Sequence, residues 1–348
     1  MSAVRRIAIL GGGSWGTALA IVLTRSHRPH DIFLWVHNAR LAEDLRRERE
    51  NKTYLPGHAL PQEVQVVNDI AATVGAADTV VMAVPSSYAR AVLAQSRPHL
   101  RRESAVVSAT KGLEPSTHLR MTEVIAQVCG LKSDQVAVLS GPSFAQEAAR
   151  GEPTAVVIAS RNAASPAGEI EGGGGKLAAE LQEEFAGPGF RLYTNSDVLG
   201  VELAGAMKNV MAIAAGACQG LGLGSNALAA LITRGLAEMS RLAVALGARQ
   251  ETLSGLAGLG DLVLTCTGSL SRNRHVGLEL GKGRALKEIL ANMRMVAEGV
   301  GTTAALLALA SEAQIELPIT EQVNAILHSG KAPSDAIREI MERPLKRE

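Results

Sequence analysis

The sequence has few aromatic residues and almost no net charge. Phe, Trp and Tyr make up 3% of its 348 residues, so it has little ring surface on which nucleic-acid bases could stack. Its 35 basic and 34 acidic residues leave a net charge of +1, which gives no reason to expect a nucleic acid or an anionic membrane surface as partner. The 35 glycines favour tightly packed helices and sites lined by backbone.

Cysteine is also scarce. Cys129, Cys218 and Cys266 are widely spaced, odd in number and form no C-x-x-C pair, which predicts reduced thiols and neither disulfides nor a zinc site. The eight histidines show no metal-ligand spacing, and we therefore expect no metal. A strand-like segment begins at residue 5, so we expect no signal peptide and a cytoplasmic protein.

A long apolar run is present but is broken. Residues 209–233 carry no charge, which raises the question of a membrane span. The run is rich in Ala rather than Leu, and "QGLGLGSN" (219–226) interrupts it with a turn. We therefore expect no membrane span.

The first half of the chain alternates strand-like and helix-like segments, which predicts an α/β fold with a parallel sheet. The expected strands are 5–10, 32–36, 79–84, 104–110, 135–140, 154–160 and 190–194. The strand signal then stops and a mainly helical half begins. This change predicts a sheet domain over 1–195 and a helical domain over 196–348. The segment "EGGGGK" (171–176) is expected to be a flexible surface loop.

The first strand runs into a glycine-rich turn and then a helical segment. Gly11, Gly13 and Gly16 form the pattern G-x-G-x-x-G. Gly11 allows a tight turn, Gly13 lets a pyrophosphate approach the backbone, and Gly16 allows close helix packing. The setting predicts a dinucleotide-binding Rossmann domain, with a turn that only connects two elements as the plainer alternative.

Two later strands also end in polar segments. One ends in Thr110-Lys111-Gly112 and the next in Ser140-Gly141-Pro142-Ser143. Each alone is typical of a solvated surface or a turn. Because ligands of open parallel sheets bind beyond the carboxyl ends of the strands, together they indicate one crevice.

Lys208 is the only charged residue between Glu202 and Arg234. A buried ammonium group needs a counter-charge. Asp261, also flanked by apolar segments, could supply it. The alternative is a lysine at a helix edge whose ammonium reaches water.

Ser271-Arg272-Asn273-Arg274 brings hydroxyl, guanidinium and amide donors together ten residues after Asp261. Such a cluster binds phosphate or carboxylate well. A solvated helix cap accounts for it equally well at this point.

Several blocks resemble one family, the bacterial-type NAD(P)-dependent sn-glycerol-3-phosphate dehydrogenases. They are "GGGSWGTALA", "NKTYLPG", "ATKGLE", "SGPSFAQE", "GVELAGAMKNVMAIAAG", "ALITRGLAEMSRL", "GLAGLGDLVLTCTGSLSRNR" and "VAEGVGT". The resemblance implies a Rossmann domain and a C-terminal helical domain like that of 6-phosphogluconate dehydrogenase. It also implies NAD or NADP as cofactor, dihydroxyacetone phosphate and sn-glycerol 3-phosphate as substrates, and a supply role for phospholipid synthesis in the cytoplasm. It leaves the oligomeric state open, with a homodimer as one option.

The resemblance implies roles for particular residues. Lys208 matches the catalytic lysine. The matching substrate contacts are Lys111, Gly141, Ser143, Lys208, Asp261, Ser271, Arg272 and Asn273. The glycine turn and the matching cofactor contacts comprise Gly11, Gly13, Ser14, Trp15, Gly16, His37, Lys111, Ala145, Arg272, Val296 and Glu298. Ala204 stands where the family usually has Gly, and His37 where Arg is common.

Alcohol oxidation needs hydride transfer to the nicotinamide and removal of the hydroxyl proton. We expect desolvation to lower the pKa of Lys208, so that it exchanges this proton near neutral pH while Asp261 orients it. Two rival functions stay open from the residues alone. A hydroxy-acid dehydrogenase of the same plan would use Arg272 for a carboxylate, and a non-catalytic dinucleotide sensor would need no buried Lys and Asp.

The second expected strand ends in His37-Asn38-Ala39-Arg40, with no acid before Glu43. Enzymes strict for NAD usually place an acid there, which binds the ribose hydroxyl and would repel a 2′-phosphate. His37 and Arg40 could contact that phosphate, and Asn38 a plain hydroxyl. We therefore expect both coenzymes to be used, with a preference for NADPH.

Overall fold

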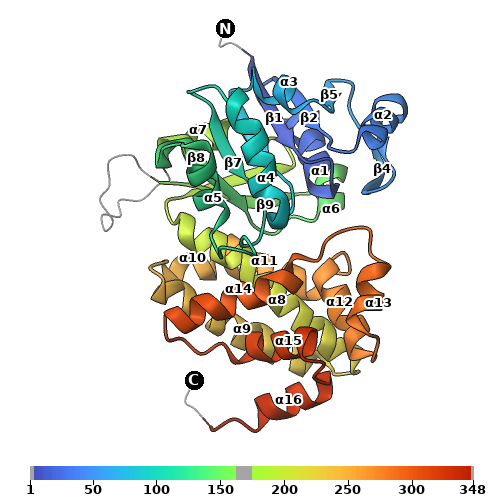
Figure 1. Ribbon diagram of the computed structural model, residues 1–348, viewed down its shortest axis with the longest axis vertical. Helices are drawn as coiled ribbons and strands as arrows, with labels where there is room; N and C mark the ends of the chain where they lie inside the picture. Colours follow the sequence, from blue (N-terminus) through green and yellow to red (C-terminus); the bar gives the residue numbers. More distant parts are fainter. Residues whose placement is uncertain (1–3, 162–174, 346–348) are drawn as a thin grey trace. The chain divides into compact units, whose positions relative to one another are not determined.

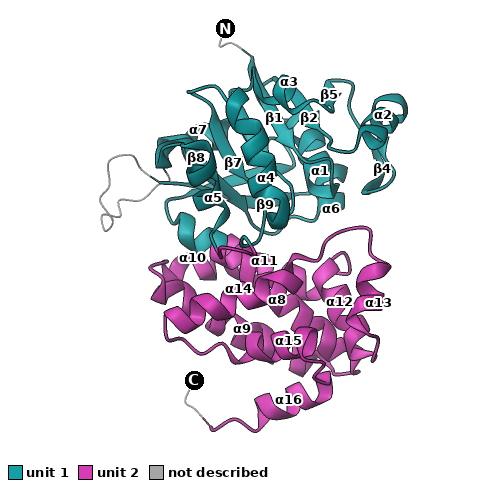
Figure 2. Cartoon of the chain, viewed as in Figure 1, with its two compact units in different colours: residues 1–114, 119–202 teal, residues 115–118, 203–348 magenta. Residues whose placement is uncertain are grey.

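The computed structural model describes residues 4–161 and 175–345. This part of the chain divides into two compact units, and Figure 2 colours them separately. Unit 1 comprises residues 1–114 and 119–202, and unit 2 residues 115–118 and 203–348. The expected loop at 171–176 lies mostly outside the described residues. The expected domain boundary near residue 195 stays a prediction.

Unit 1 is built on an eight-stranded sheet of order β10-β9-β8-β7-β6-β1-β2-β5 (Figure 1). Its strands are β1 (Arg5–Leu10), β2 (His30–Trp35), β5 (Val64–Val67), β6 (Thr79–Met82), β7 (Ala105–Ser108), β8 (Val136–Ser140), β9 (Thr154–Ser160) and β10 (Phe190–Asn195). The predicted α/β fold is thus confirmed. The sheet is parallel except at β9, which pairs antiparallel with β8. β10 pairs parallel with β9 and therefore runs in the same direction as β9.

Helices cover both faces of this sheet because its central strands are apolar on both sides. Ile7 and Ile9 of β1 lie in one buried cluster and Ala8 and Leu10 in another, as the two-residue period of a strand requires. The first cluster is covered by α1 (Ser14–Leu23), α2 (Ala39–Glu48), α6 (Ala145–Arg150) and α7 (Lys176–Phe185). The second is covered by α3 (Ile70–Val74), α4 (Ser86–Ser96) and α5 (Met121–Cys129).

Three strands were not predicted from the sequence. β3 (Glu50–Asn51) and β4 (Leu55–Ala59) form a small antiparallel pair, and β5 is four residues long. Pro56 and Gly57 within β4 are poor strand formers. Segments of two to five residues are also too short to show the alternating pattern of a strand.

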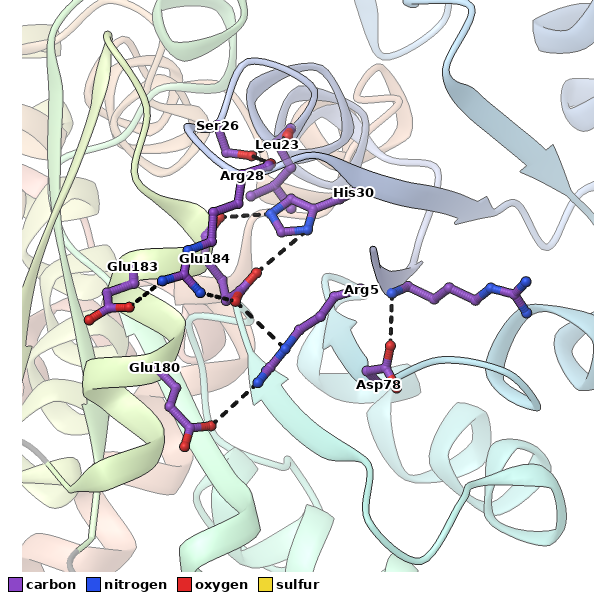
Figure 3. Close-up of polar contacts among 10 residues, drawn as sticks. Arg5, Leu23, Ser26, Arg28, His30, Asp78, Glu180, Glu183 and Glu184 are labelled. Atoms are coloured by element: carbon purple, nitrogen blue, oxygen red, sulfur yellow. Dashed lines mark hydrogen bonds and ion pairs between the residues drawn. The ribbon is translucent and has the colours of Figure 1, made fainter. Parts of the chain in front are cut away.

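Charged side chains join α7 to the starts of β1 and β2 (Figure 3). The buried carboxylate of Glu184 lies 2.8 Å from Nη1 of Arg28 and 3.6 Å from Nε of Arg5. Nε2 of His30 lies 2.8 Å from the carbonyl oxygen of Glu184 and must donate to it, because a carbonyl only accepts. This network ties α7 to the sheet at the strand ends away from the glycine turn.

Unit 2 consists of helices in the part of the chain that the structure describes, apart from loops. They are α8 (Val198–Gly220), which begins in unit 1, α9 (Ser225–Ala245), α10 (Gln250–Ser254), the π-helical turn η3 (Leu256–Gly260), α11 (Asp261–Thr267), α12 (Arg272–Gly281), α13 (Leu286–Ala291), α14 (Glu298–Glu312), α15 (Pro318–His328) and α16 (Pro333–Met341). The predicted turn between α8 and α9 is confirmed. By length and composition α8 could cross a membrane, but 89% of its most apolar stretch is buried inside the protein, as expected of a core helix.

Glycines let α8 and α12 approach backbone to backbone. A Cβ atom added at Gly216 would lie 1.9 Å from the carbonyl oxygen of Arg274, and one added at Gly277 would lie 1.9 Å from that of Ile213. No larger residue fits at such a contact. The crossing places the N-terminal end of α12 beside the middle of α8, where Lys208 lies.

Candidate functional site

The glycine turn joins β1 to α1 in unit 1. Gly11 has φ +126°, and a Cβ atom there would lie 2.8 Å from the carbonyl oxygen of Ala83. A Cβ atom at Gly16 would lie 1.9 Å from the carbonyl oxygen of Gly11. Both positions therefore require glycine, the first for its backbone conformation and the second for close packing.

Gly13 differs from its neighbours because its missing side chain faces open space. A Cβ atom added there would meet nothing within 4 Å. Gly13 is also the N-cap of α1, and no side chain caps that helix. The N–H groups of Ser14 and Trp15 thus lie in a helix N-terminus that can receive an anion. The residues fit the pyrophosphate of a dinucleotide.

The end of β2 is polar and exposed. His37 packs against Trp35, with ring centroids 5.6 Å apart. Oδ1 of Asn38 accepts a hydrogen bond from the N–H of Leu41 and caps α2. This use of Asn38 leaves His37 and Arg40 as the exposed groups that could meet a 2′-phosphate.

The polar segments that follow β7 and β8 lie side by side, while the crevice they are expected to form stays a prediction. Nζ of Lys111 donates to the carbonyl oxygen of Gly141 at 2.7 Å and lies 3.3 Å from Oγ of Ser143. Ser143 donates to the same carbonyl at 2.9 Å. Ala145, the first residue of α6, lies two residues after Ser143. These residues form one polar corner beyond the strand ends of unit 1.

Lys208 and Asp261 form a buried ion pair in unit 2. Nζ of Lys208 lies 2.8 Å from Oδ1 of Asp261, with side-chain exposures of 8% and 1%. Nζ also lies 2.8 Å from Oγ1 of Thr265, which donates to the carbonyl oxygen of Asp261. The lysine does not reach water from a helix edge. It is held inside the unit by groups on a second helix.

The neighbourhood of this pair is also buried. Cys266 follows Thr265 and is fully buried. Burial raises the pKa of its thiol to about 12, although the charge of Lys208 acts in the opposite direction. Desolvation therefore outweighs a nearby positive charge in this part of the unit.

Some of the polar groups that were predicted to bind an anion at the start of α12 form hydrogen bonds within the protein. Nδ2 of Asn273 donates to Oδ1 of Asn209 at 2.9 Å, and its Oδ1 accepts from the N–H of Gly299 at 3.0 Å. Ser271 is the N-cap of α12 and accepts from the N–H of Arg274. Asn273 thus links α12 to the residue that follows Lys208.

Arg272 is the most open group of that cluster. Its side chain is exposed, and Nη1 donates to the carbonyl oxygen of Val296 at 2.9 Å. Glu298 begins α14 two residues after Val296. The three residues that the resemblance matched to cofactor contacts in the second half therefore belong to one small region of unit 2.

Sequence reasoning missed two residues of this site. Thr265 was not singled out, although it lies four residues after Asp261 and so on the same helix face. Asn209 had no signal beyond its position next to Lys208. Among the described residues, no group of three or more His, Cys, Asp or Glu side chains could hold a metal ion, and all three cysteines are free.

A Rossmann-type sheet with a G-x-G-x-x-G turn, followed by a helical unit with a buried Lys–Asp pair, defines the class of two-domain nicotinamide-dependent dehydrogenases. Family models described as NAD-dependent glycerol-3-phosphate dehydrogenase N-terminus and C-terminus match residues 6–165 and 197–338. The chain belongs to this family of NAD-dependent glycerol-3-phosphate dehydrogenases.

Similar proteins agree with the family models. Glycerol-3-phosphate dehydrogenase (NAD(P)+) of Koribacter versatilis is 52% identical over 341 residues, covering 97% of each chain. The enzyme of the same name from Acidobacterium capsulatum is 51% identical over 346 residues, covering 97% of this chain and 98% of its own. A crystal structure of glycerol-3-phosphate dehydrogenase from Coxiella burnetii has a TM-score of 0.89 at 42% identity and covers 98% of this chain and 99% of its own.

Proposed function

We propose that this chain catalyses the reversible reduction of dihydroxyacetone phosphate to sn-glycerol 3-phosphate with NADH or NADPH. The observation that carries the proposal is the buried Lys208–Asp261 pair with Thr265, in a chain of the glycerol-3-phosphate dehydrogenase family. A dinucleotide sensor has no use for such a pair, because burying two charges costs several kcal/mol each before they interact.

The coenzyme supplies the hydride when it is bound, and the chain's own residues hold it. In unit 1, the open face of Gly13 and the N-terminal N–H groups of α1 suit its pyrophosphate. The predicted contacts of His37 with the 2′-phosphate of NADPH, and of Lys111, Ala145, Arg272, Val296 and Glu298 with other parts of the coenzyme, are part of this proposal.

Lys208 is the proton donor of the proposed reaction. As the carbonyl carbon accepts hydride, its oxygen gains negative charge and needs a proton. The ammonium of Lys208 would first polarise that carbonyl and then donate to it. Asp261 and Thr265 hold Nζ at 2.8 Å each, so they fix its direction before the substrate arrives.

Arg272 is the proposed ligand of the substrate phosphate. A guanidinium presents two parallel N–H groups to a phosphate. Ser271 and Asn273 lie beside it at the start of α12, where the helix dipole adds to the attraction. Lys111, Gly141 and Ser143 are proposed as further substrate contacts.

The proposal extends to the role in the cell. Product sn-glycerol 3-phosphate would serve phospholipid synthesis in the cytoplasm, without nucleic-acid partners. A homodimer is the proposed assembly, and light scattering tests it.

Initial rates test the proposed function. Dihydroxyacetone phosphate is reduced with NADPH and with NADH, and sn-glycerol 3-phosphate is compared with 2- and 3-hydroxy acids in the reverse direction. We expect turnover of the two phosphates and at least about 100-fold lower kcat/KM with the acids, because the acids lack the phosphate that Arg272 binds. A preference for a hydroxy acid would contradict the proposal, and coenzyme binding without any turnover would favour the sensor.

A further inference from the structure

Asn51 is a buried polar residue outside the sites described so far. It is the last residue of β3, it is 0% exposed, and it pairs with Leu55 of β4. Its side-chain Nδ2 donates to the carbonyl oxygen of Gly12 at 2.9 Å and to Oγ1 of Thr17 at 2.8 Å. Its Oδ1 accepts from the backbone N–H of Tyr54 at 3.1 Å.

The orientation of the Asn51 amide follows from its partners. A carbonyl oxygen only accepts and a backbone N–H only donates. Turning the amide over would place its oxygen against the Gly12 carbonyl and its NH₂ against the Tyr54 N–H. The network therefore permits one orientation, and a residue without an NH₂ group cannot replace it.

The bond to Gly12 acts on the peptide that leads into Gly13. In a planar trans peptide the C=O of Gly12 and the N–H of Gly13 point in opposite directions. Holding the carbonyl toward Asn51 therefore fixes the N–H on the other side. Gly12 is also restrained by packing, since a Cβ atom there would lie 2.8 Å from Cγ2 of Val36.

We propose that Asn51 is a positioning residue for coenzyme binding. Its hydrogen bond to the Gly12 carbonyl fixes the orientation of the Gly12–Gly13 peptide. The open face of Gly13 and the first N–H groups of α1 are thereby oriented toward the pyrophosphate before the coenzyme binds. Preorganised donors bind better because no ordering cost remains. The proposal rests on coenzyme binding at the glycine turn and not on the identity of the substrate.

The test compares Asn51→Leu with Thr17→Val. Leu fills a similar volume without adding charge but cannot donate to Gly12. Val at residue 17 removes the second acceptor of Asn51 and leaves the bond to Gly12 intact, so it is the matched control for losing a buried hydrogen bond nearby. Dissociation constants for NADPH, ADP-ribose and adenosine 2′-phosphate are measured by fluorescence titration, together with the unfolding temperature.

The proposal predicts a specific pattern. Asn51→Leu should weaken NADPH and ADP-ribose by a similar factor of about 10, because both contain the pyrophosphate. Adenosine 2′-phosphate, which lacks it, should bind as to the wild type. At saturating NADPH, kcat and the KM for dihydroxyacetone phosphate should stay within about twofold, and Thr17→Val should keep its coenzyme affinity.

Other outcomes overturn the proposal. A lower unfolding temperature with unchanged NADPH affinity would make Asn51 a structural residue only, and so would equal weakening by both variants. If Asn51→Leu does not fold, Asn51→Ser is judged by the same affinities, and failure of both to fold would also assign Asn51 to folding. Absence of turnover with dihydroxyacetone phosphate would contradict the proposed substrate. The coenzyme dissociation constants would still test the role of Asn51, because they do not depend on turnover.

Discussion

The glycine turn and the Lys208 site are built in opposite ways. The turn consists of backbone, with glycines where a side chain would meet Ala83 or Gly11 and an open face at Gly13. The Lys208 site consists of side chains, with a buried ion pair and a hydroxyl that come from α8 and α11. Each feature suits its task, because a pyrophosphate needs N–H groups at close range whereas proton transfer needs a titratable group.

The two sites are therefore sensitive to different substitutions. At the turn, added volume should cost coenzyme affinity. At Lys208, removed charge should cost turnover. The loss of coenzyme affinity and the loss of turnover should therefore be separable.

Replacing Lys208 should have the largest effect. We expect Lys208→Ala to lower kcat by about 100-fold or more, since an essential acid–base group is lost, while coenzyme affinity stays within about twofold. Steady-state rates and a coenzyme titration on one preparation measure both. The variant leaves the buried carboxylate of Asp261 without the counter-charge of Lys208, which destabilises the fold, so Lys208→Ala/Asp261→Asn serves as a control for folding. Near-normal turnover in Lys208→Ala would remove the lysine from the mechanism.

Two glycines offer a matched pair of steric changes, one in each unit. A Cβ atom would lie 1.9 Å from a backbone oxygen at Gly16 and also at Gly277, so each Ala variant must shift the backbone. We expect Gly16→Ala to raise the coenzyme dissociation constant at least about tenfold, which is 1.4 kcal/mol or more. Gly277→Ala should instead lower kcat, because α12 then moves against α8. Equal losses of coenzyme affinity in both variants would contradict the assignment of coenzyme binding to the glycine turn alone.

Arg272→Lys should lower the preference of the enzyme for a phosphorylated substrate. The variant keeps the charge but loses the planar fork, so we expect the preference for dihydroxyacetone phosphate over dihydroxyacetone to fall about tenfold. Arg274→Lys, two residues along α12, is the control and should keep the wild-type preference. Wild-type selectivity in Arg272→Lys would show that another group binds the phosphate.

The coenzyme preference concerns the end of β2. With His37 and Arg40 exposed and Asn38 used as a helix cap, kcat/KM should be higher for NADPH than for NADH. Arg40→Ala should reduce that ratio, because it removes a positive charge near the 2′-phosphate. A preference for NADH of tenfold or more, about 1.4 kcal/mol, in the wild type would refute this interpretation.

The smallest expected effect concerns thiol reactivity. Burial raises the pKa of Cys266 to about 12 and that of Cys129 to about 11. At pH 8 about one Cys266 in ten thousand would then be thiolate, and about ten times more of Cys129. Iodoacetamide labelling followed by mass spectrometry should be slow at both and should rise about tenfold from pH 8 to pH 9. Rapid labelling of Cys266 at pH 8 would mean that water reaches the surroundings of Lys208.

Much of the fold could be predicted because its signals are local. The G-x-G-x-x-G turn stands between a strand and a helix in the sequence and in the structure. The direction of β9 could not be predicted, since an apolar strand has the same pattern whichever way it runs. β3 and β4 were missed because they are too short to show a period.

The candidate site was predictable in part for the same reason. Lys208 and Asp261 stand out as single charges in apolar segments, and the structure pairs them. Their catalytic role and the ligand contacts stay predictions. Asn51 and Asn209 carry no such signal, because a buried amide differs from a surface amide only in its partners, and these lie 39 and 64 residues away in sequence.

The most direct test of this separation of roles compares Gly13→Ala with Lys208→Ala. Both variants are measured by single-turnover rate at saturating NADPH and dihydroxyacetone phosphate and by NADPH titration. A methyl group at Gly13 enters open space, so this variant should fold normally, bind NADPH at least about tenfold more weakly and keep its single-turnover rate once saturated. Lys208→Ala should bind NADPH normally and lose about 100-fold or more of that rate. If both variants lose affinity and rate together, the division of labour between the two sites is wrong.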